Sequence, residues 1–171
     1  MVKDPDKLER REGPWYYEMH EIGYNYRITD FQCALGKNQL KKLDNFVNKR
    51  RRLAEHYDKL LSNTNNLFIP NTNNKIRHSY HLYPLCLDFK KMKLSKSDIF
   101  DRMKSLGVNL QVHYIPVHLQ PYHRKRFGFN LGDFPISEKF YNNEISLPIY
   151  PYLNILDQEK ICNSLIALLN E

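Results

Sequence analysis

The sequence holds little cysteine and has no long hydrophobic run. Its three cysteines among 171 residues, Cys33, Cys86 and Cys162, lie far apart, and each sits within an apolar pattern. We therefore expect reduced, buried thiols rather than a disulfide framework or a metal site. No stretch approaches the roughly 20 apolar residues that span a bilayer, and residues 1–13 lack the apolar segment of a signal peptide. These absences predict a cytoplasmic protein with no membrane partner.

Basic residues outnumber acidic ones, and the net charge is +7 at neutral pH. Such a charge favours acidic partners, which include nucleic acid, an anionic membrane surface and phosphorylated small molecules. The basic run at 48–52 (NKRRR) shares a helical pattern with Leu53 and Tyr57, and no nucleic-acid recognition motif accompanies it. We expect these charges to form the solvated face of a helix, and we do not predict a nucleic-acid partner.

A long helical pattern follows the irregular residues at 1–28. Apolar residues recur at three- and four-residue intervals as far as Leu61, which predicts one helix over 29–62 with one buried face. Thr29 and Gln32 have the spacing of a capping box, and Gly36 offers a point where the helix can bend. A pattern longer than about 25 residues is typical of a helix that bridges two domains or lies against another subunit.

The rest of the chain, 63–171, alternates between strand and helix periodicity. Ser95 and Asp98 mark a helix start and Gly107 its end, while Pro84 indicates an edge strand or a bulge. The order of elements predicts an α+β domain, in which a small sheet has helices packed on one side. The predicted elements are a turn-rich connection at 63–74, strands at 79–89, 108–115 and 146–151, and helices at 95–106, 138–143 and 157–169.

Two polar residues stand just before the predicted start of the long helix. Asn25 offers an amide donor and Arg27 a fixed cation, and the positive end of the helix dipole adds to both, so a phosphate can bind here. From the residues alone, Asn25 serves equally well as support for the turn. Arg27 has the alternative of pairing with a carboxylate such as Asp30.

Three histidines, His113, His118 and His123, recur at intervals of five in the sequence. This spacing matches neither a helical face nor one side of a strand. No cysteine or carboxylate nearby completes a tetrahedral set, so we do not predict a metal site.

Several segments together resemble the carboxy-terminal half of the DegT/DnrJ sugar aminotransferases. The resemblance implies the small C-terminal domain (63–171) of a fold-type I pyridoxal 5'-phosphate (PLP) enzyme. A long bridging helix precedes it, an arm and active-site loop at 1–28 packs on the large domain, and the large cofactor domain itself is absent. A nucleotide sugar as substrate, glutamate as amino donor and a homodimer are also implied. The segments are GYNYRITDFQ with the helix after it, HSYHLYPL, GVNLQVHYIPVHLQPYHRK, GDFP and SLPIYP.

The resemblance also assigns roles to individual residues. Asn25 matches the Asn of the family's Asn-Tyr-Arg motif, which contacts the phosphate of the neighbouring subunit's PLP, and Arg27 is expected to meet a substrate phosphate. His113, Tyr114 and His118 match a segment beside the sugar-nucleotide site. We expect them to donate hydrogen bonds to the diphosphate or to sugar hydroxyls. A purely structural role for the histidines is the alternative.

One part of the family pattern has no match. The family's lysine that holds PLP covalently lies in a Ser/Thr-rich segment followed by Glu-Gly-Gly, and no such segment occurs here. Lys96 in KLSKSD lacks the Glu-Gly-Gly, and we expect it to be a solvated surface residue. The prediction is therefore a carboxy-terminal fragment that does not transaminate alone. The alternatives are a non-catalytic module that completes a partner's active site and a basic nucleic-acid-binding domain.

Overall fold

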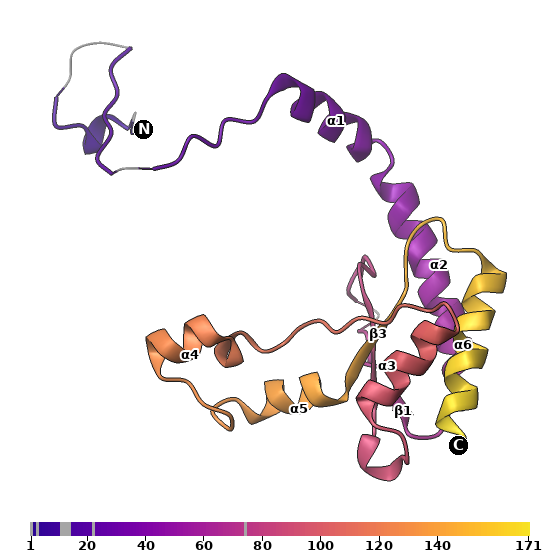
Figure 1. Cartoon of the computed structure of the whole chain (residues 1–171). Helices are drawn as coiled ribbons and strands as arrows, with labels where there is room; N and C mark the ends of the chain where they lie inside the picture. The colour runs from indigo at the N-terminus through magenta and orange to yellow at the C-terminus, as the bar shows by residue number, and fades with distance from the viewer. Residues whose placement is uncertain (1, 3, 11–14, 22, 74) are drawn as a thin grey trace. The chain divides into compact units, whose positions relative to one another are not determined.

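The computed structural model describes residues 2, 4–10, 15–21, 23–73 and 75–171. These residues form two compact units, which divide between Lys41 and Lys42. The first unit contains the 3-10 turn η1 (Pro5–Lys7) and helix α1 (Asp30–Leu40), and the second contains the sheet and the other α-helices (Figure 1). No helix in the described ranges combines the length and the hydropathy that a membrane span requires.

The arm of the first unit is organised by one acidic side chain. Val2 and Glu18 form a short antiparallel bridge. The Glu18 carboxylate also accepts hydrogen bonds from the backbone N–H groups of Glu9 (2.8 Å) and Arg10 (2.9 Å). The bond from Glu9 is the largest cause of a pKa of Glu18 lowered to about 2, and His20 adds to it. A local turn is thus closed in a segment whose sequence shows no periodicity.

Helix α1 begins at the predicted capping box. The N–H of Gln32 donates to Thr29 Oγ1 (3.4 Å), and the N–H of Thr29 donates to Gln32 Oε1 (2.9 Å). No residue of α1 is buried, and Phe31 is 91% exposed. Cys33 is exposed too, so the expectation of a buried thiol is wrong at this position, whereas Cys162 is buried.

The single helix predicted over 29–62 is wrong, because the structure has two. α1 ends at Leu40, and α2 (Leu43–Leu61) follows after an interruption at Lys41 and Lys42. Gly36 lies inside α1 and is not the break. Both lysines keep right-handed helical dihedrals, so the interruption is a small local change in the backbone. A pattern of hydrophobic residues does not reveal such a change.

The sheet of the second unit has three antiparallel strands in the order β1, β2, β3. They are β1 (Leu67–Phe68), β2 (Tyr83–Leu87) and β3 (Glu144–Leu147). β2 is therefore the central strand, and the expectation that Pro84 marks an edge strand is wrong for the sheet as a whole. Because β1 pairs only with Cys86 and Leu87, β3 is the only strand of the sheet that lies beside Pro84. The absence of an N–H group on the proline therefore costs the sheet no hydrogen bond to β1.

The strand predicted at 108–115 is also wrong. Only Gln111 pairs, in an isolated bridge with Ser146 of β3. β3 is four residues long, and the next donor along the segment, the N–H of His113, binds the carboxylate of Glu144 instead of a ladder carbonyl (3.0 Å). The segment is extended, as its alternation indicates, but a side chain satisfies its backbone.

Two helices named by the sequence are confirmed by their caps. α3 (Lys96–Ser105) has the capping box of Ser95 and Asp98, and Gly107 beyond its end takes a φ of +82°. α6 (Ile155–Leu169) is capped by Asn154 and starts two residues earlier than predicted. The helix at 138–143 is present within α5 (Pro135–Asn143), while α4 (Pro121–Phe127) and the 3-10 turns η2 (Phe89–Lys91) and η3 (Val117–Leu119) were not predicted.

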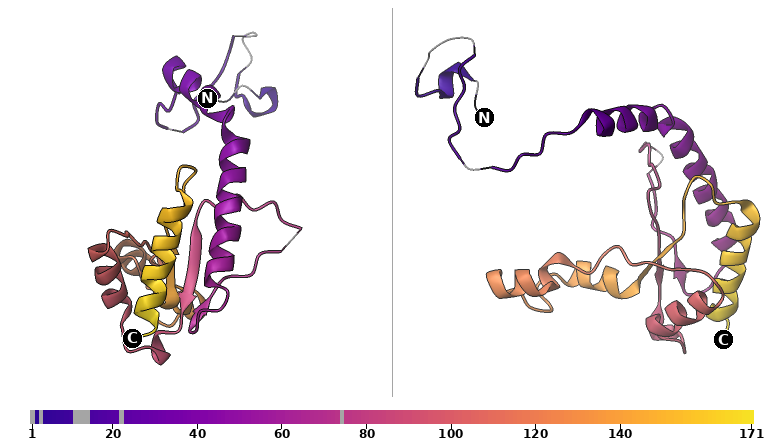
Figure 2. Two further views of the ribbon diagram at one scale, coloured as in Figure 1. Left: turned by 90° about the vertical axis from the view of Figure 1, so that its right-hand side faces the viewer. Right: turned by 45° about the horizontal axis from the view of Figure 1, so that its top comes forward.

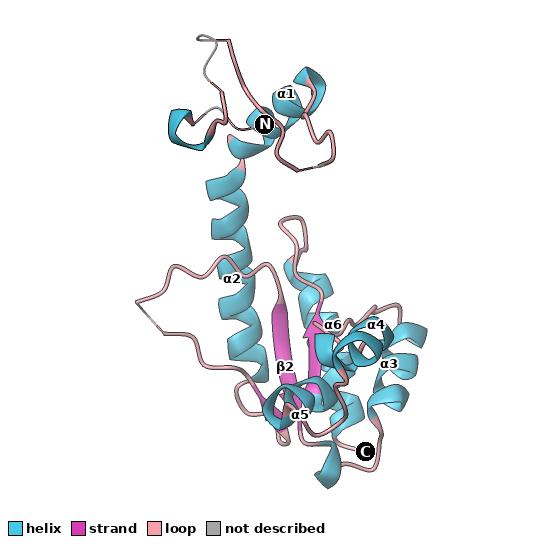
Figure 3. Ribbon diagram, turned by 90° about the vertical axis from the view of Figure 1, so that its left-hand side faces the viewer, coloured by secondary structure: helices cyan, strands magenta, loops and turns pink. Residues whose placement is uncertain are grey.

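The main core lies between one face of the sheet and helices α2, α3 and α6 (Figures 1 and 2). Alternate residues of β2, namely Tyr83, Leu85 and Leu87, are buried in it. Helices do not all pack on one side, however, since α5 lies against β2 from the opposite face (Figure 3). The α+β class is confirmed, with two layers of helix rather than one. The other buried apolar residues are Leu53, Ala54, Tyr57, Leu61, Leu67, Ile99, Met103, Val108, Leu110, Ile145, Leu147, Leu153, Ile161, Cys162, Leu165 and Leu168.

Candidate functional site

The segment at 112–118 carries three of the predicted site residues and leads from the bridge at Gln111 into η3. His113 and His118 are engaged by partners within the chain, whereas Tyr114 is 69% exposed. The Tyr114 ring lies edge-on to that of His113, with 4.7 Å between the ring centroids. The structure therefore presents one aromatic side chain outward and anchors the two histidines beside it.

His113 is held by two polar residues of β3. Its Nδ1 lies 2.8 Å from Ser146 Oγ, and its backbone N–H donates to Glu144 Oε2 (3.0 Å). Ser146 Oγ–H donates in turn to Glu144 Oε1 (2.5 Å). Both β3 residues are buried on the face opposite Ile145, because side chains alternate along a strand. Sequence reasoning missed them, although polar residues at alternate positions of EISL were the signal.

Lys96 lies close to this network and is not a solvated surface lysine, so that expectation is wrong. Its side chain is half-buried, with Nζ donating to the carbonyl of Tyr141 (2.5 Å) and lying 4.8 Å from the centroid of the Tyr141 ring. Burial lowers the pKa of Lys96, and the charge of Glu144 opposes that effect. Burial likewise raises the pKa of the Cys86 thiol on β2.

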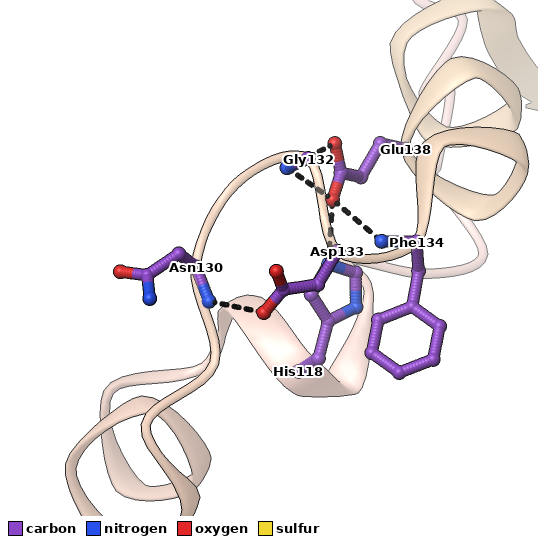
Figure 4. Close-up of polar contacts among 6 residues, drawn as sticks. All are labelled: His118, Asn130, Gly132, Asp133, Phe134 and Glu138. Carbon is purple, nitrogen blue, oxygen red and sulfur yellow. Dashed lines mark hydrogen bonds and ion pairs between the residues drawn. The ribbon is translucent and has the colours of Figure 1, made fainter.

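His118 is buried against α5 (Figure 4). Its Nε2 lies 2.8 Å from Glu138 Oε1, and its ring packs on Phe134 with 4.7 Å between the centroids. Glu138 also accepts from the backbone N–H groups of Gly132 (2.9 and 3.0 Å) and Phe134 (3.3 Å). The bond from His118 is the largest cause of the lowered pKa of Glu138. One carboxylate thus ties the histidine to the loop before α5.

The three evenly spaced histidines do not converge. His113 and His118 have the separate partners described above, and the ring of His123 stacks on Phe127 with 5.8 Å between the centroids. Within the described part of the chain, no group of three or more His, Cys, Asp or Glu side chains is arranged to hold a metal ion.

The basic run at 48–52 lies on α2 and is only partly solvated, so the expected solvated face is wrong for its middle. Lys49, Arg50 and Arg51 are half-buried. Arg51 Nε donates to the carbonyl of His78 (2.8 Å), and Lys49 Nζ lies 5.3 Å from the centroid of the Tyr152 ring. These cations therefore stabilise packing inside the second unit.

The other two predicted site residues are in the first unit. Asn25 Oδ1 accepts the backbone N–H of Arg27 (3.3 Å), so the side-chain oxygen supports the turn. The amide nitrogen of Asn25 has no partner among the described residues, and the residue is exposed. Arg27 is exposed as well and forms no ion pair with a described residue, Asp30 included. Turn support thus uses only the oxygen of the Asn25 amide.

Comparison with known proteins gives consistent matches over nearly the whole chain. A model of the DegT/DnrJ/EryC1/StrS aminotransferase family matches residues 6–166. The uncharacterized protein MJ1066 of Methanocaldococcus jannaschii is 37% identical over 99% of this chain and 44% of its own length. The UDP-4-amino-4,6-dideoxy-N-acetyl-beta-L-altrosamine transaminase of Campylobacter jejuni (serotype O:2) is 33% identical over 98% of this chain and 45% of its own.

A solved structure gives the same result for the fold. Helicobacter pylori PseC, an aminotransferase involved in the biosynthesis of pseudoaminic acid, superposes with a TM-score of 0.81 and 29% identity. The superposition covers 94% of this chain and 42% of PseC. The chain thus spans less than half the length of each of these relatives.

Proposed function

This chain belongs to the DegT/DnrJ/EryC1/StrS aminotransferase family, and we propose that it forms the carboxy-terminal part of an enzyme that aminates a nucleotide-linked 4-keto-6-deoxy sugar. The observation that carries the proposal is the family match over residues 6–166, because it includes both the loop with Asn25 and the segment with His113. The cofactor of the family is PLP, and the proposed amino donor is glutamate.

A more specific substrate follows from the named relatives. The Campylobacter jejuni relative is a UDP-linked altrosamine transaminase, and PseC acts in pseudoaminic acid biosynthesis. We assign this chain to the same step, the formation of a 4-amino sugar for a surface glycan. The chain's three free thiols agree with a reducing cytoplasm as its location.

The residues near Asn25 fit one part of PLP, its phosphate. The exposed amide N–H₂ of Asn25 is a neutral donor with no partner among the described residues, and the capped start of α1 follows it. We propose that Asn25 donates to the phosphate of PLP held by a second subunit of a homodimer, and that Arg27 meets a phosphate of the substrate. When bound, PLP supplies the electron sink for amino transfer.

We do not assign the covalent attachment of PLP to Lys96. Lys96 is half-buried, burial lowers its pKa, and its amine already donates to the carbonyl of Tyr141. We therefore propose that this chain does not transaminate alone and that it completes a partner's site. In the second unit, His113 and Tyr114 contact the nucleotide sugar. His118 contributes by holding the segment to Glu138, since its Nε2 is already engaged.

The experiment is an amination assay on the complete chain. A UDP-linked 4-keto-6-deoxy sugar, PLP and glutamate are incubated with the chain, with the amino-terminal half of the Campylobacter jejuni relative, or with both, and the amino sugar is measured by mass spectrometry. The proposal predicts product only when both polypeptides are present. Product from this chain alone contradicts it, and so does the absence of product from the mixture.

A further inference from the structure

Glu144, Ser146 and His113 form a closed circuit of hydrogen bonds on the face of the sheet opposite the main core. Glu144 is fully buried and Ser146 nearly so. The two oxygens of Glu144 accept from Ser146 Oγ–H (2.5 Å) and from the backbone N–H of His113 (3.0 Å). Ser146 Oγ then meets His113 Nδ1 at 2.8 Å.

Counting protons in this circuit shows which nitrogen of a neutral His113 ring carries the proton. A serine hydroxyl has one proton, and here Glu144 accepts it, so only lone pairs of Ser146 Oγ remain for His113. The proton of the 2.8 Å contact must therefore sit on His113 Nδ1. A neutral imidazole has only one N–H, so Nε2 carries a lone pair. Nε2 has no hydrogen-bond partner among the residues that the structure describes.

Glu144 has the surroundings of a carboxylate rather than a carboxylic acid in this circuit. One of its oxygens accepts the backbone N–H of His113, and the Ser146 hydroxyl lies within hydrogen-bond distance of the other. The cation of Lys96 also lies near enough to interact with its charge. The direction of the Ser146 bond, from hydroxyl to carboxylate, follows from this charge.

We propose that Glu144 and Ser146 hold neutral His113 as the Nδ1–H tautomer, so that its Nε2 accepts a hydrogen bond from a hydroxyl or N–H group of the nucleotide sugar and does not donate to a phosphate oxygen. This inference rests on the proposed function, in which the segment at 112–118 contacts the substrate. It reverses the expectation from sequence that His113 is a donor. Glu144 is a positioning residue here, because it acts on the ligand only through His113.

His118 provides an internal comparison in the same chain. Its Nε2 faces the carboxylate of Glu138 directly at 2.8 Å, with no hydroxyl between them. An ionised carboxylate only accepts, so the neutral ring of His118 carries its proton on Nε2. The two histidines, five residues apart, are thus predicted to be opposite tautomers.

Long-range ¹H–¹⁵N correlation spectra of the complete, ligand-free chain test the inference, because the two ring nitrogens give distinct shifts in each tautomer. On the neutral rings, His113 should show Nδ1–H and His118 Nε2–H. His113 found as Nε2–H would overturn the inference. Glu138→Gln is the matched control, and it should leave the tautomer of His113 unchanged.

Glu144→Gln should reverse the circuit rather than abolish it. The Gln oxygen still accepts the His113 N–H, so its NH₂ group points at Ser146 Oγ, and the serine proton turns to His113 Nδ1. Neutral His113 should then become Nε2–H. An unchanged Nδ1–H tautomer in a folded Glu144→Gln protein contradicts the circuit. If that variant does not fold, Ser146→Ala takes its place, and it should allow the Nε2–H form of His113 to appear.

Titration with UDP-N-acetylglucosamine separates this inference from the function on which it rests. A ligand-dependent shift of His113 Nε2, with the proton kept on Nδ1, supports both. Protonation of Nε2 by the bound ligand overturns the inference and leaves the function standing. If no resonance of the chain responds to the UDP-sugar, the proposed function of the segment is contradicted, whereas the tautomer is still decided by the ligand-free spectra.

Discussion

The side-chain amide of Gln158 on α6 donates to the backbone carbonyl of Leu53 on α2, with 2.6 Å between nitrogen and oxygen. Gln158 is fully buried, and its Oε1 lies 2.8 Å from Nδ1 of His56, so it binds two points of the neighbouring helix. Helices α2 and α6, two of the three that cover the main core, are therefore joined by polar contacts as well as by apolar packing.

Replacing Gln158 tests how much this junction stabilises the second unit. Gln158→Ala removes two hydrogen bonds of a buried side chain, and the free energy of unfolding should fall by about 1–3 kcal/mol. The measurement is urea unfolding followed by circular dichroism. Asn163→Ala on the exposed side of the same helix is the control and should change stability by no more than about 0.5 kcal/mol. Equal effects of the two substitutions would refute the role of Gln158.

The two capping boxes should differ in their effect on stability. Ser95→Ala removes the cap of α3, whose Ile99 and Met103 are buried, and should cost about 1 kcal/mol of global stability. Thr29→Ala removes the equivalent cap of α1, which buries no residue, so global stability should stay unchanged while α1 frays. Denaturant unfolding measures the first effect and amide exchange in α1 the second. A global loss from Thr29→Ala would show that α1 is part of the folding core.

Stability should fall at alkaline pH because of two buried phenols. Burial is the largest cause of the raised pKa of Tyr57 and of Tyr83, and the hydrogen bond from Tyr83 to Asp58 (2.5 Å) raises that of Tyr83 further. The native state keeps both protons while the unfolded chain releases them above about pH 10. The stability that the two buried phenols contribute is thus present below pH 10 and is lost as pH rises.

Phenolate absorbance and circular dichroism, recorded together during an alkaline titration, check this prediction. Tyr57 and Tyr83 should ionise only as the helical signal is lost. In the Tyr83→Phe variant, only one tyrosine should show this late ionisation. If all tyrosines titrate near pH 10 in a chain that stays folded, the burial argument fails.

The arm should open in acid. Hydrogen bonds lower the pKa of Glu18 to about 2 in the native arm, against an ordinary value of 4.5. The stability that Glu18 contributes to the folded arm is therefore complete above about pH 4.5 and is lost as pH falls through 2. Glu18→Gln should produce the same opening at neutral pH, seen as faster amide exchange at Glu9 and Arg10. Glu21→Gln, an exposed neighbour, is the control, and identical exchange in both variants would contradict the account.

Local signals predicted part of this fold because the residues that define an element lie within it. The helix of α3 is marked by Ser95, Asp98 and Gly107, and all three act as expected. The apolar spacing of α6 likewise predicts the burial of Ile161, Leu165 and Leu168, although not that of Gln158. Such elements need no knowledge of distant parts of the chain.

Several misses share a physical cause, because the deciding partner lies far away in the sequence. Alternation at 108–115 cannot distinguish a strand from an extended segment whose N–H group binds the carboxylate of Glu144, 31 residues later. The partner of His118 is 20 residues away, on α5. For the same reason the sequence named the histidines of the candidate site but not the carboxylates that hold them.

The central claim is that this chain completes a PLP site held by another polypeptide, and Asn25 tests it most directly. The measurement is the dissociation constant of PLP for the chain mixed with the amino-terminal half of the Campylobacter jejuni relative. A hydrogen bond to a charged group contributes about 1.5–3 kcal/mol, so Asn25→Ala should weaken PLP binding roughly 10- to 150-fold. Asn45→Ala, an exposed position on α2, should leave it unchanged. Equal affinity of the Asn25→Ala and unmodified mixtures would contradict the claim.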